Sequence, residues 1–167
     1  NSDKHVIRPV AIPADWSRFR AMDWGSAKPF SVGWWAIVGD NLRHPDGLTI
    51  PRGAIVRYRQ WYGVKYEGSK IQPNVGIKLT AEAVADGIIE REQGEKITGS
   101  VIDPAAFSED GGPSIAERMQ RRKHPTLQGR VLFRPADNKR VATVGALGGW
   151  DMMRHRLVGE DGVPMLY

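Results

Sequence analysis

The spacing of apolar residues changes partway along this chain of 167 residues. Up to residue 62 the apolar runs have the alternating or continuous pattern of β-strands, whereas Ala81, Val84, Ala85 and Ile88 recur at the period of a helix. Three strands joined by short connections predict an antiparallel meander, and a strand reached through a helix is expected to lie parallel to the first strand. The chain is therefore predicted to have an α/β fold.

The residues that start and stop each run set the expected boundaries. Thr80 is expected to cap the first helix, and Ser114 with Glu117 has the spacing of a capping box. Residues 164–167 resemble the start of a further strand, so five or six strands are expected. The expected order is β-β-β-α-β-α-β-α, with strands at 16–23, 30–38, 54–62, 97–103 and 131–134 and helices at 80–93, 114–123 and 149–158.

Composition favours one globular domain and excludes several kinds of site. Hydrophobic residues make up 41% and charged residues 26%, and no run approaches the ~20 apolar residues of a membrane span. The lack of cysteine removes disulfides, thiolate zinc sites and cysteine nucleophiles. A net charge of +5 permits a polyanionic partner without requiring one. Residues 1–15, which contain Pro9 and Pro13, are expected to form an extended lead-in.

Two aspartates end two of the predicted strands. Asp23 is followed by Trp24 and Gly25, and Asp103 by Pro104. If their strands are parallel neighbours, the carboxylates meet at one edge and repel by about 4 kcal/mol at ~4 Å and an effective dielectric of ~20. Mg²⁺ or Mn²⁺ would relieve this repulsion, and a pair of such ions can activate water for phosphoryl displacement. The alternative is that both aspartates only cap turns, a common role before Gly or Pro.

Several segments match a known family. They are residues 16–25 (WSRFRAMDWG) with Pro29 and Phe30, 101–105 (VIDPA), 111–117 (GGPSIAE), 136–140 (ADNKR) and 149–157 (GWDMMRHRL). Together they resemble the C-terminal nuclease domain of tailed-bacteriophage terminase large subunits, and the resemblance covers nearly the whole chain from Pro13 onward. It implies a ribonuclease H-like mixed sheet of five to six strands flanked by helices.

The resemblance also implies an activity and a setting. Residues 16–167 would be a metal-dependent endonuclease domain, truncated at its C-terminus, that cuts concatemeric viral DNA, with Asp23 and Asp103 as catalytic ligands of two Mg²⁺ or Mn²⁺ ions. Residues 1–15 would lead in from an N-terminal ATPase domain. The implied partners are double-stranded DNA, that ATPase domain, the small terminase subunit and the portal protein, in the cytoplasm of the host cell. The chain has no phosphate-binding Gly-x-x-x-x-Gly-Lys-Ser/Thr motif, so it is not expected to hydrolyse ATP by itself.

A third carboxylate ligand is harder to find. Asp151 is a candidate because Val144 and Leu147, at i−7 and i−4, would share its helix face toward the sheet. In the family the third acid comes from a later helix start, for which the chain offers no match. Asp137 is expected to be an N-cap, and Glu82 to stabilise a helix N-terminus or to act as an extra ligand.

Basic residues are candidates for contacts with DNA phosphates, which carry no base information. They are Lys28, Arg121, Arg122, Lys139 and Arg140. Arg121 and Arg122 also suit a solvated helix C-terminus. Trp34 and Trp35 are expected in the core, whereas Trp61 suits either packing or base stacking.

Two other functions fit the same pattern. One is another ribonuclease H-like polynucleotidyl transferase, such as an integrase or a resolvase. The other is a module that grips DNA without cutting it.

Overall fold

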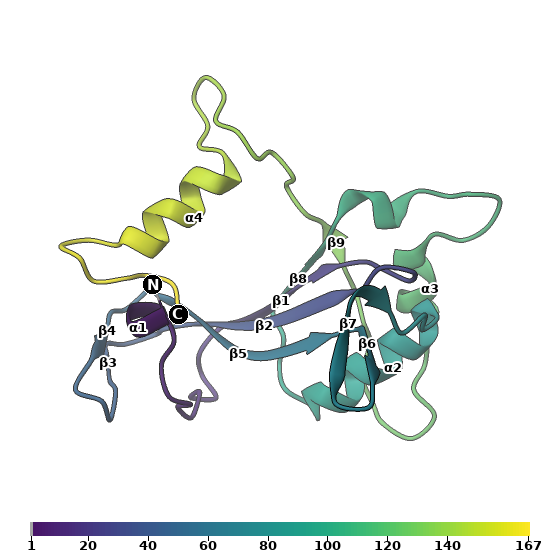
Figure 1. Cartoon of the computed structure of the whole chain (residues 1–167), viewed down its shortest axis with the longest axis horizontal. Coiled ribbons are helices and arrows are strands. Elements are labelled where there is room, and N and C mark those ends of the chain that lie inside the picture. The colour runs from purple at the N-terminus through teal and green to yellow at the C-terminus, as the bar shows by residue number, and fades with distance from the viewer. Residues whose placement is uncertain (1) are drawn as a thin grey trace. The chain divides into compact units, whose positions relative to one another are not determined.

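A computed structural model describes residues 2–167, and its centre is a five-stranded sheet (Figure 1). The strand order is β5-β2-β1-β8-β9, and β8 pairs with β9 in parallel. The first strand is therefore central, with the early strands on one side and the later strands on the other. This mixed sheet with flanking helices confirms the predicted ribonuclease H-like fold class. The strands are β1 (Arg18–Asp23), β2 (Ser31–Ile37), β5 (Ile55–Tyr62), β8 (Gly99–Ile102) and β9 (Arg134–Pro135).

The three predicted helices form, and local capping explains where two of them begin. The Thr80 hydroxyl accepts a hydrogen bond from the Ala83 amide at 3.2 Å. Ser114 and Glu117 form the reciprocal capping box. The helical elements are α1 (Ser2–His5), α2 (Ala81–Glu92), η1 (Pro104–Phe107), α3 (Ile115–Arg121) and α4 (Gly149–Val158).

Two hairpins add strands that the apolar pattern did not predict. β3 (Leu42–Arg43) pairs with β4 (Thr49–Ile50), and β6 (Val64–Glu67) pairs with β7 (Lys70–Gly76). The second hairpin turns through Gly68 and Ser69, and Gly68 has a φ of 58°. A two-residue loop with Gly at positive φ is a hairpin signal, so the sequence did contain evidence for this element.

The structure contradicts two predictions about the ends and edge of the fold and confirms a third. The strand predicted at 131–134 is wrong in position, because β9 covers only Arg134–Pro135. The prediction for residues 1–15 is wrong in that the lead-in contains helix α1; residue 1 lies outside the described part. Strand-like pairing at 164–167 is confirmed, since Leu166 forms a parallel bridge with Ile55.

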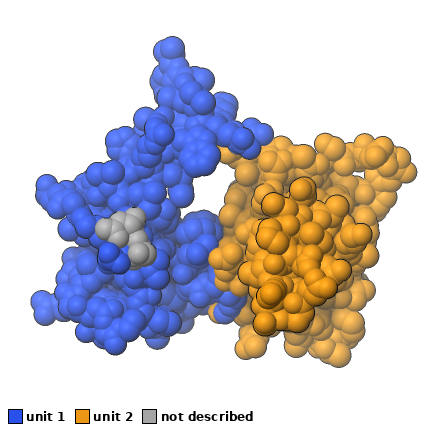
Figure 2. Space-filling model, viewed as in Figure 1, with its two compact units in different colours: residues 1–19, 34–59, 138–167 blue, residues 20–33, 60–137 orange. Residues whose placement is uncertain are grey.

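The chain divides into two compact units (Figure 2). Unit 1 comprises residues 1–19, 34–59 and 138–167, and unit 2 comprises residues 20–33 and 60–137. The core of unit 1 includes Trp16, Ala36, Ile50, Val56 and Tyr167, and Ile7 and Ile12 of the lead-in pack against it. Within residues 2–167 no helix combines the length and apolar character needed to cross a membrane.

The tryptophans of the sheet serve packing. Trp34 is fully buried, as predicted. Trp35 is half-buried and stacks on Phe19, with ring centroids 6.3 Å apart. The Arg91 guanidinium lies 3.8 Å from the Trp61 ring centroid, and Phe30 meets Trp61 edge to face. Of the two roles predicted for Trp61, these contacts favour packing.

Candidate functional site

Asp23 and Asp103 both stand at strand ends. Asp23 is the exposed last residue of β1, and its carboxylate makes no hydrogen bond or ion pair with any other residue in the range 2–167. Asp103 directly follows β8 and is half-buried; its Oδ1 accepts a hydrogen bond from the Ala105 amide at 2.8 Å, which caps η1. The turn-capping role is therefore confirmed for Asp103, while its second carboxylate oxygen has no partner among the described residues.

Contacts with the helices fix the direction of β1. Arg20, early in β1, hydrogen bonds to Glu92 at the last turn of α2. The loop after Asp23 lies at the other end of the helix, because the Ala27 carbonyl accepts from the Gly76 amide a few residues before Thr80, the N-cap of α2. β1 therefore runs from the C-terminal end of α2 toward its N-terminal end.

β8 runs the same way. Ser100, near its start, hydrogen bonds to Arg20 and so lies close to the C-terminal end of α2. After β8, η1 packs against α3, whose Arg118 pairs with Glu82 in the first turn of α2. The two neighbouring strands are therefore parallel, as the crossover through a helix predicts.

The Arg20–Ser100 contact links the two strands through their side chains. Arg20 Nε donates to Ser100 Oγ at 2.8 Å. Asp23 and Asp103 each lie three residues further on. In parallel strands, matched residues stay side by side along the ladder. Asp23 and Asp103 therefore lie at the same edge of the sheet, each about 10 Å along its strand from the residue that makes this contact.

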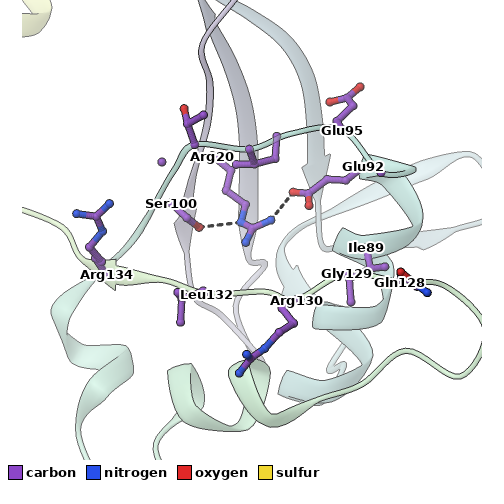
Figure 3. A pocket seen from close by; sticks show the side chains of 14 residues that line it. Arg20, Ile89, Glu92, Glu95, Ser100, Gln128, Gly129, Arg130, Leu132 and Arg134 are labelled. Atoms are coloured by element: carbon purple, nitrogen blue, oxygen red, sulfur yellow. Dashed lines mark hydrogen bonds and ion pairs between the residues drawn. The ribbon is translucent and has the colours of Figure 1, made fainter. Parts of the chain in front are cut away.

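Arg20 belongs to a buried polar group that also contains Glu92 and Ser100 (Figure 3). Arg20 Nε and Nη1 bind Ser100 and Glu92, and the side chains of Arg20 and Glu92 are only 4% and 11% exposed. The guanidinium also lies 5.1 Å from the Phe133 ring centroid. A cavity of about 250 Å³ opens beside Arg20 and is bordered by Arg130 and Arg134. The sequence analysis missed this group, although the charge of Arg20 at an inward strand position, two residues before buried Met22, is a signal for it.

Metal binding by Asp23 and Asp103 stays a prediction, which the chemistry of their oxygens suits. Three carboxylate oxygens of Asp23 and Asp103 remain without protein partners among the described residues, and carboxylate oxygen is the ligand that Mg²⁺ and Mn²⁺ prefer. Among residues 2–167, no three His, Asp or Glu side chains gather in a metal-binding group. The chain therefore supplies two carboxylates, and water or phosphate oxygen would complete the coordination.

Asp151 and Asp137 do not lie in the surroundings that the sequence predicts for them. Val144 and Leu147 precede α4 and are exposed, and α4 buries none of its residues, so the expected sheet-facing stripe beside Asp151 is wrong. Asp151 lies 3.6 Å from Arg154. The N-cap predicted at Asp137 is also wrong, because no helix begins there and the N-cap of α4 is Gly148.

Glu82 is held by an arginine of the neighbouring helix. Arg118 donates two hydrogen bonds of 2.8 Å to its carboxylate. This hydrogen bonding lowers the pKa of Glu82 from 4.5 to about 2. The pair secures α2 to α3, which gives Glu82 a structural partner in place of a metal ion.

The predicted DNA-contacting residues differ in availability. Lys28 is exposed in the loop that follows Asp23. Arg122 pairs with Asp86, the shortest of their contacts being 2.6 Å, and this hydrogen bond lowers the pKa of Asp86. Arg121 is exposed and lies 3.4 Å from Glu117 of its own helix. Lys28 and Arg121 thus remain better placed than Arg122 to meet a phosphate.

The other two predicted contacts, Lys139 and Arg140, belong to unit 1. Both are exposed. Their backbone carbonyls accept hydrogen bonds from the Gly149 and Trp150 amides at 2.9 and 3.3 Å. These bonds close the loop in front of α4, and a role of the two side chains in DNA contact stays a prediction.

No family model and no curated protein matches the chain. Among solved structures it is similar to the large terminase of a thermophilic bacteriophage, with 17% identity, 64% of this chain and 22% of that chain covered, and a TM-score of 0.43. It is also similar to the P22 large terminase nuclease domain, with 12% identity, 71% and 48% covered, and a TM-score of 0.44. The chain thus spans about a fifth of the thermophilic phage protein and about half of the P22 domain.

Proposed function

We propose that this chain is a metal-dependent DNA endonuclease of the terminase type, which hydrolyses phosphodiester bonds in viral DNA. The observation that carries the proposal is that Asp23 and Asp103 stand at the same end of two neighbouring strands, each three residues beyond the Arg20–Ser100 hydrogen bond. Two carboxylates brought together this way repel unless a cation lies between them. The sequence motifs described above are consistent with this activity.

Asp23 and Asp103 would hold Mg²⁺ or Mn²⁺, as one ion or a pair. The bound ion would lower the pKa of a water molecule and stabilise the leaving oxygen. Asp103 is oriented by its hydrogen bond from Ala105, so one oxygen is fixed while the other has no partner within residues 2–167. Lys28, in the loop next to Asp23, would neutralise a phosphate of the DNA backbone.

The same proposal implies a substrate, protein partners and a cell compartment. The substrate would be concatemeric double-stranded DNA, contacted through its phosphates by Arg121, Arg122, Lys139 and Arg140 as well as Lys28. An ATPase domain in the same polypeptide would move the DNA, and the small terminase subunit and the portal protein would be partners. The reaction would then take place in the cytoplasm of the host bacterium.

The test is nicking of supercoiled plasmid DNA by the 167-residue chain in Mn²⁺ or Mg²⁺. Asp23→Asn and Asp103→Asn are each expected to lower the rate at least about a hundredfold, because asparagine keeps the shape but removes the charge that holds the ion. Asp110→Asn, an exposed carboxylate in the loop before α3, is the matched control. A Mn²⁺-induced rise in melting temperature, lost in both active-site variants, gives a readout besides activity. Parent-level cleavage by both variants would contradict the assignment.

The alternatives predict different products. A polynucleotidyl transferase would join a DNA end to a target strand, so strand-transfer products would favour that reading. A DNA-gripping module would retard DNA in a gel at low salt without cutting it in any divalent ion. Nicked plasmid without strand transfer is the result expected here.

A further inference from the structure

We propose that the buried group of Arg20, Glu92 and Ser100 sets the register of β1 and β8 that aligns Asp23 with Asp103, which makes Arg20 and Ser100 positioning residues for the cleavage site. This inference rests on the proposed function. No one of the three side chains needs to touch the substrate. They would act through the strands that carry the two carboxylates.

The first reason is the energetic character of the group. Arg20 and Glu92 are almost completely buried, with 4% and 11% of their side chains exposed. Removing two charges from water is costly, and apolar residues of similar size often stabilise a core equally well. A buried pair is therefore weak evidence for stability. Its best-attested use is to select one arrangement among several, such as one register.

The second reason is that β8 is short. It has four residues, and Ile102 is the only one fully buried. Its ladder with β9 joins just two residues of each strand. A shift of two residues keeps every side chain on its face but moves Asp103 by about 6.6 Å, too far to share an ion with Asp23. The Arg20–Ser100 hydrogen bond opposes such a shift.

The third reason is the geometry of the arginine. Its Nε binds Ser100 of β8 while Nη1 binds Glu92 of α2, so one planar group ties three elements together. The rigid fork of a guanidinium suits two partners at once, whereas the single ammonium of lysine does not. Arg20→Lys therefore preserves the charge opposite Glu92 and weakens the link to Ser100.

The nicking assay separates positioning from simple stability. Ser100→Ala and Arg20→Lys are expected to cleave at least tenfold more slowly and to need more Mn²⁺ for half-maximal rate, at temperatures where circular dichroism shows them folded. Ser31→Ala is the control, because Ser31 is a half-buried strand hydroxyl with no hydrogen bond within residues 2–167. Chemical rescue offers a second check. Added ethylguanidinium, entering through the cavity beside Arg20, is expected to restore cleavage by Arg20→Ala. It is not expected to restore cleavage by Asp103→Asn.

A cross-linking assay reports the register without relying on nuclease activity. The chain has no cysteine, so Asp23→Cys with Asp103→Cys introduces a unique pair. Matching positions on neighbouring strands bring the two within disulfide range. Rapid oxidation is expected in the parent background, with at least a fivefold slower rate when Ser100→Ala or Arg20→Lys is added.

The outcomes distinguish the two proposals. Equal cross-linking in all backgrounds overturns the positioning role, whether or not the parent cuts DNA. Parent-level cleavage by Ser100→Ala and Arg20→Lys, with Asp103→Asn inactive, overturns it while the endonuclease assignment stands. Register-dependent cross-linking in a parent that never cuts DNA supports the positioning of Asp23 and Asp103 but contradicts the proposed function.

Discussion

At the scale of single residues, Asp103 combines a structural and a proposed chemical role. One carboxylate oxygen caps η1, and the other is without a protein partner in the described chain. A side chain that caps a turn keeps a fixed orientation, which suits a metal ligand. Loss of activity in an alanine variant would therefore have two causes, lost charge and lost capping.

Asparagine and alanine at position 103 should separate these causes. Asp103→Asn keeps an acceptor for the Ala105 amide, whereas Asp103→Ala removes it and is expected to lower the free energy of unfolding by about 1 kcal/mol. Urea unfolding followed by circular dichroism measures the difference. Asp23→Ala, which removes no hydrogen bond within residues 2–167, is expected to leave stability near that of the parent. Equal stability of the two Asp103 variants would argue against the cap.

Gly76 is a second residue with a local consequence for the site. A Cβ added there would lie 2.2 Å from the Ser26 carbonyl oxygen and 2.5 Å from that of Lys28, in the loop that follows Asp23. Because backbone atoms must move, Gly76→Ala is expected to cost about 1–3 kcal/mol of unfolding free energy and to slow DNA nicking. Gly112→Ala, with nothing within 4 Å of the new Cβ, is the control for chemical denaturation and nicking assays. Parent-like behaviour of Gly76→Ala would show that this loop adjusts freely.

At the scale of elements, α2 and α3 are joined by arginine–carboxylate pairs. Arg118 pairs with Glu82, and Arg122 with Asp86. From the sequence alone, the basic end of α3 suits a solvated helix terminus or a DNA contact. Its pairing with two acids spaced four residues apart on α2 could not be predicted, because the three-dimensional packing decides which helices face each other.

This contact predicts a pH dependence of stability. The pKa of Glu82 falls from 4.5 to about 2 on folding, so its ionised form is favoured in the folded state. The stabilisation is complete above about pH 4.5 and is lost as pH falls toward 2. Glu82→Gln is expected to flatten the decline of unfolding free energy in this window, measured by urea titrations at several pH values. Glu109→Gln, an exposed acid in the loop before α3, should retain the parent's decline, and an unchanged slope in Glu82→Gln would count against the pair.

At the scale of the whole molecule, the last residues of the chain belong to the body of unit 1. The Ile55 amide donates to the Met165 carbonyl and the Arg57 amide to the Tyr167 carbonyl, at 2.9 and 2.8 Å. Leu166 is 8% exposed. His5 of the lead-in lies 3.2 Å from the Leu166 carbonyl, so the first and last described segments share this region. Both are structural parts of unit 1.

Leu166 therefore provides a test of how much the last segment contributes. Leu166→Ala is expected to lower the free energy of unfolding by about 2–3 kcal/mol, since it leaves a cavity in a buried position. Leu157→Ala makes the same change on α4, where the side chain is 38% exposed, and should cost much less. Denaturant melts of both variants measure the difference, and equal costs would show that Leu166 is not held as the structure has it.

The local parts of this fold could be predicted because they depend on neighbouring residues. The period of apolar residues, the Thr80 and Ser114 caps and the strand ends at Asp23 and Asp103 are all set by short stretches of chain. The sequence alone therefore determined the order of the main elements and two candidate ligands. It did not place β9 correctly, because that strand has two residues and depends on its neighbour β8 for its existence.

The tertiary structure determined which distant residues and elements became neighbours. Arg20 meets Glu92 and Ser100 across 72 and 80 residues of sequence, and no local pattern encodes such a contact. The same holds for Arg118 with Glu82. It also holds for Asp151, whose expected face relied on Val144 and Leu147, which precede α4 and are exposed. Backbone periodicity selects an element, but burial and charge pairing between distant elements select its register and its partners. For that reason the sequence named Asp23 and Asp103, and only the folded chain showed that their strands are neighbours in the sheet.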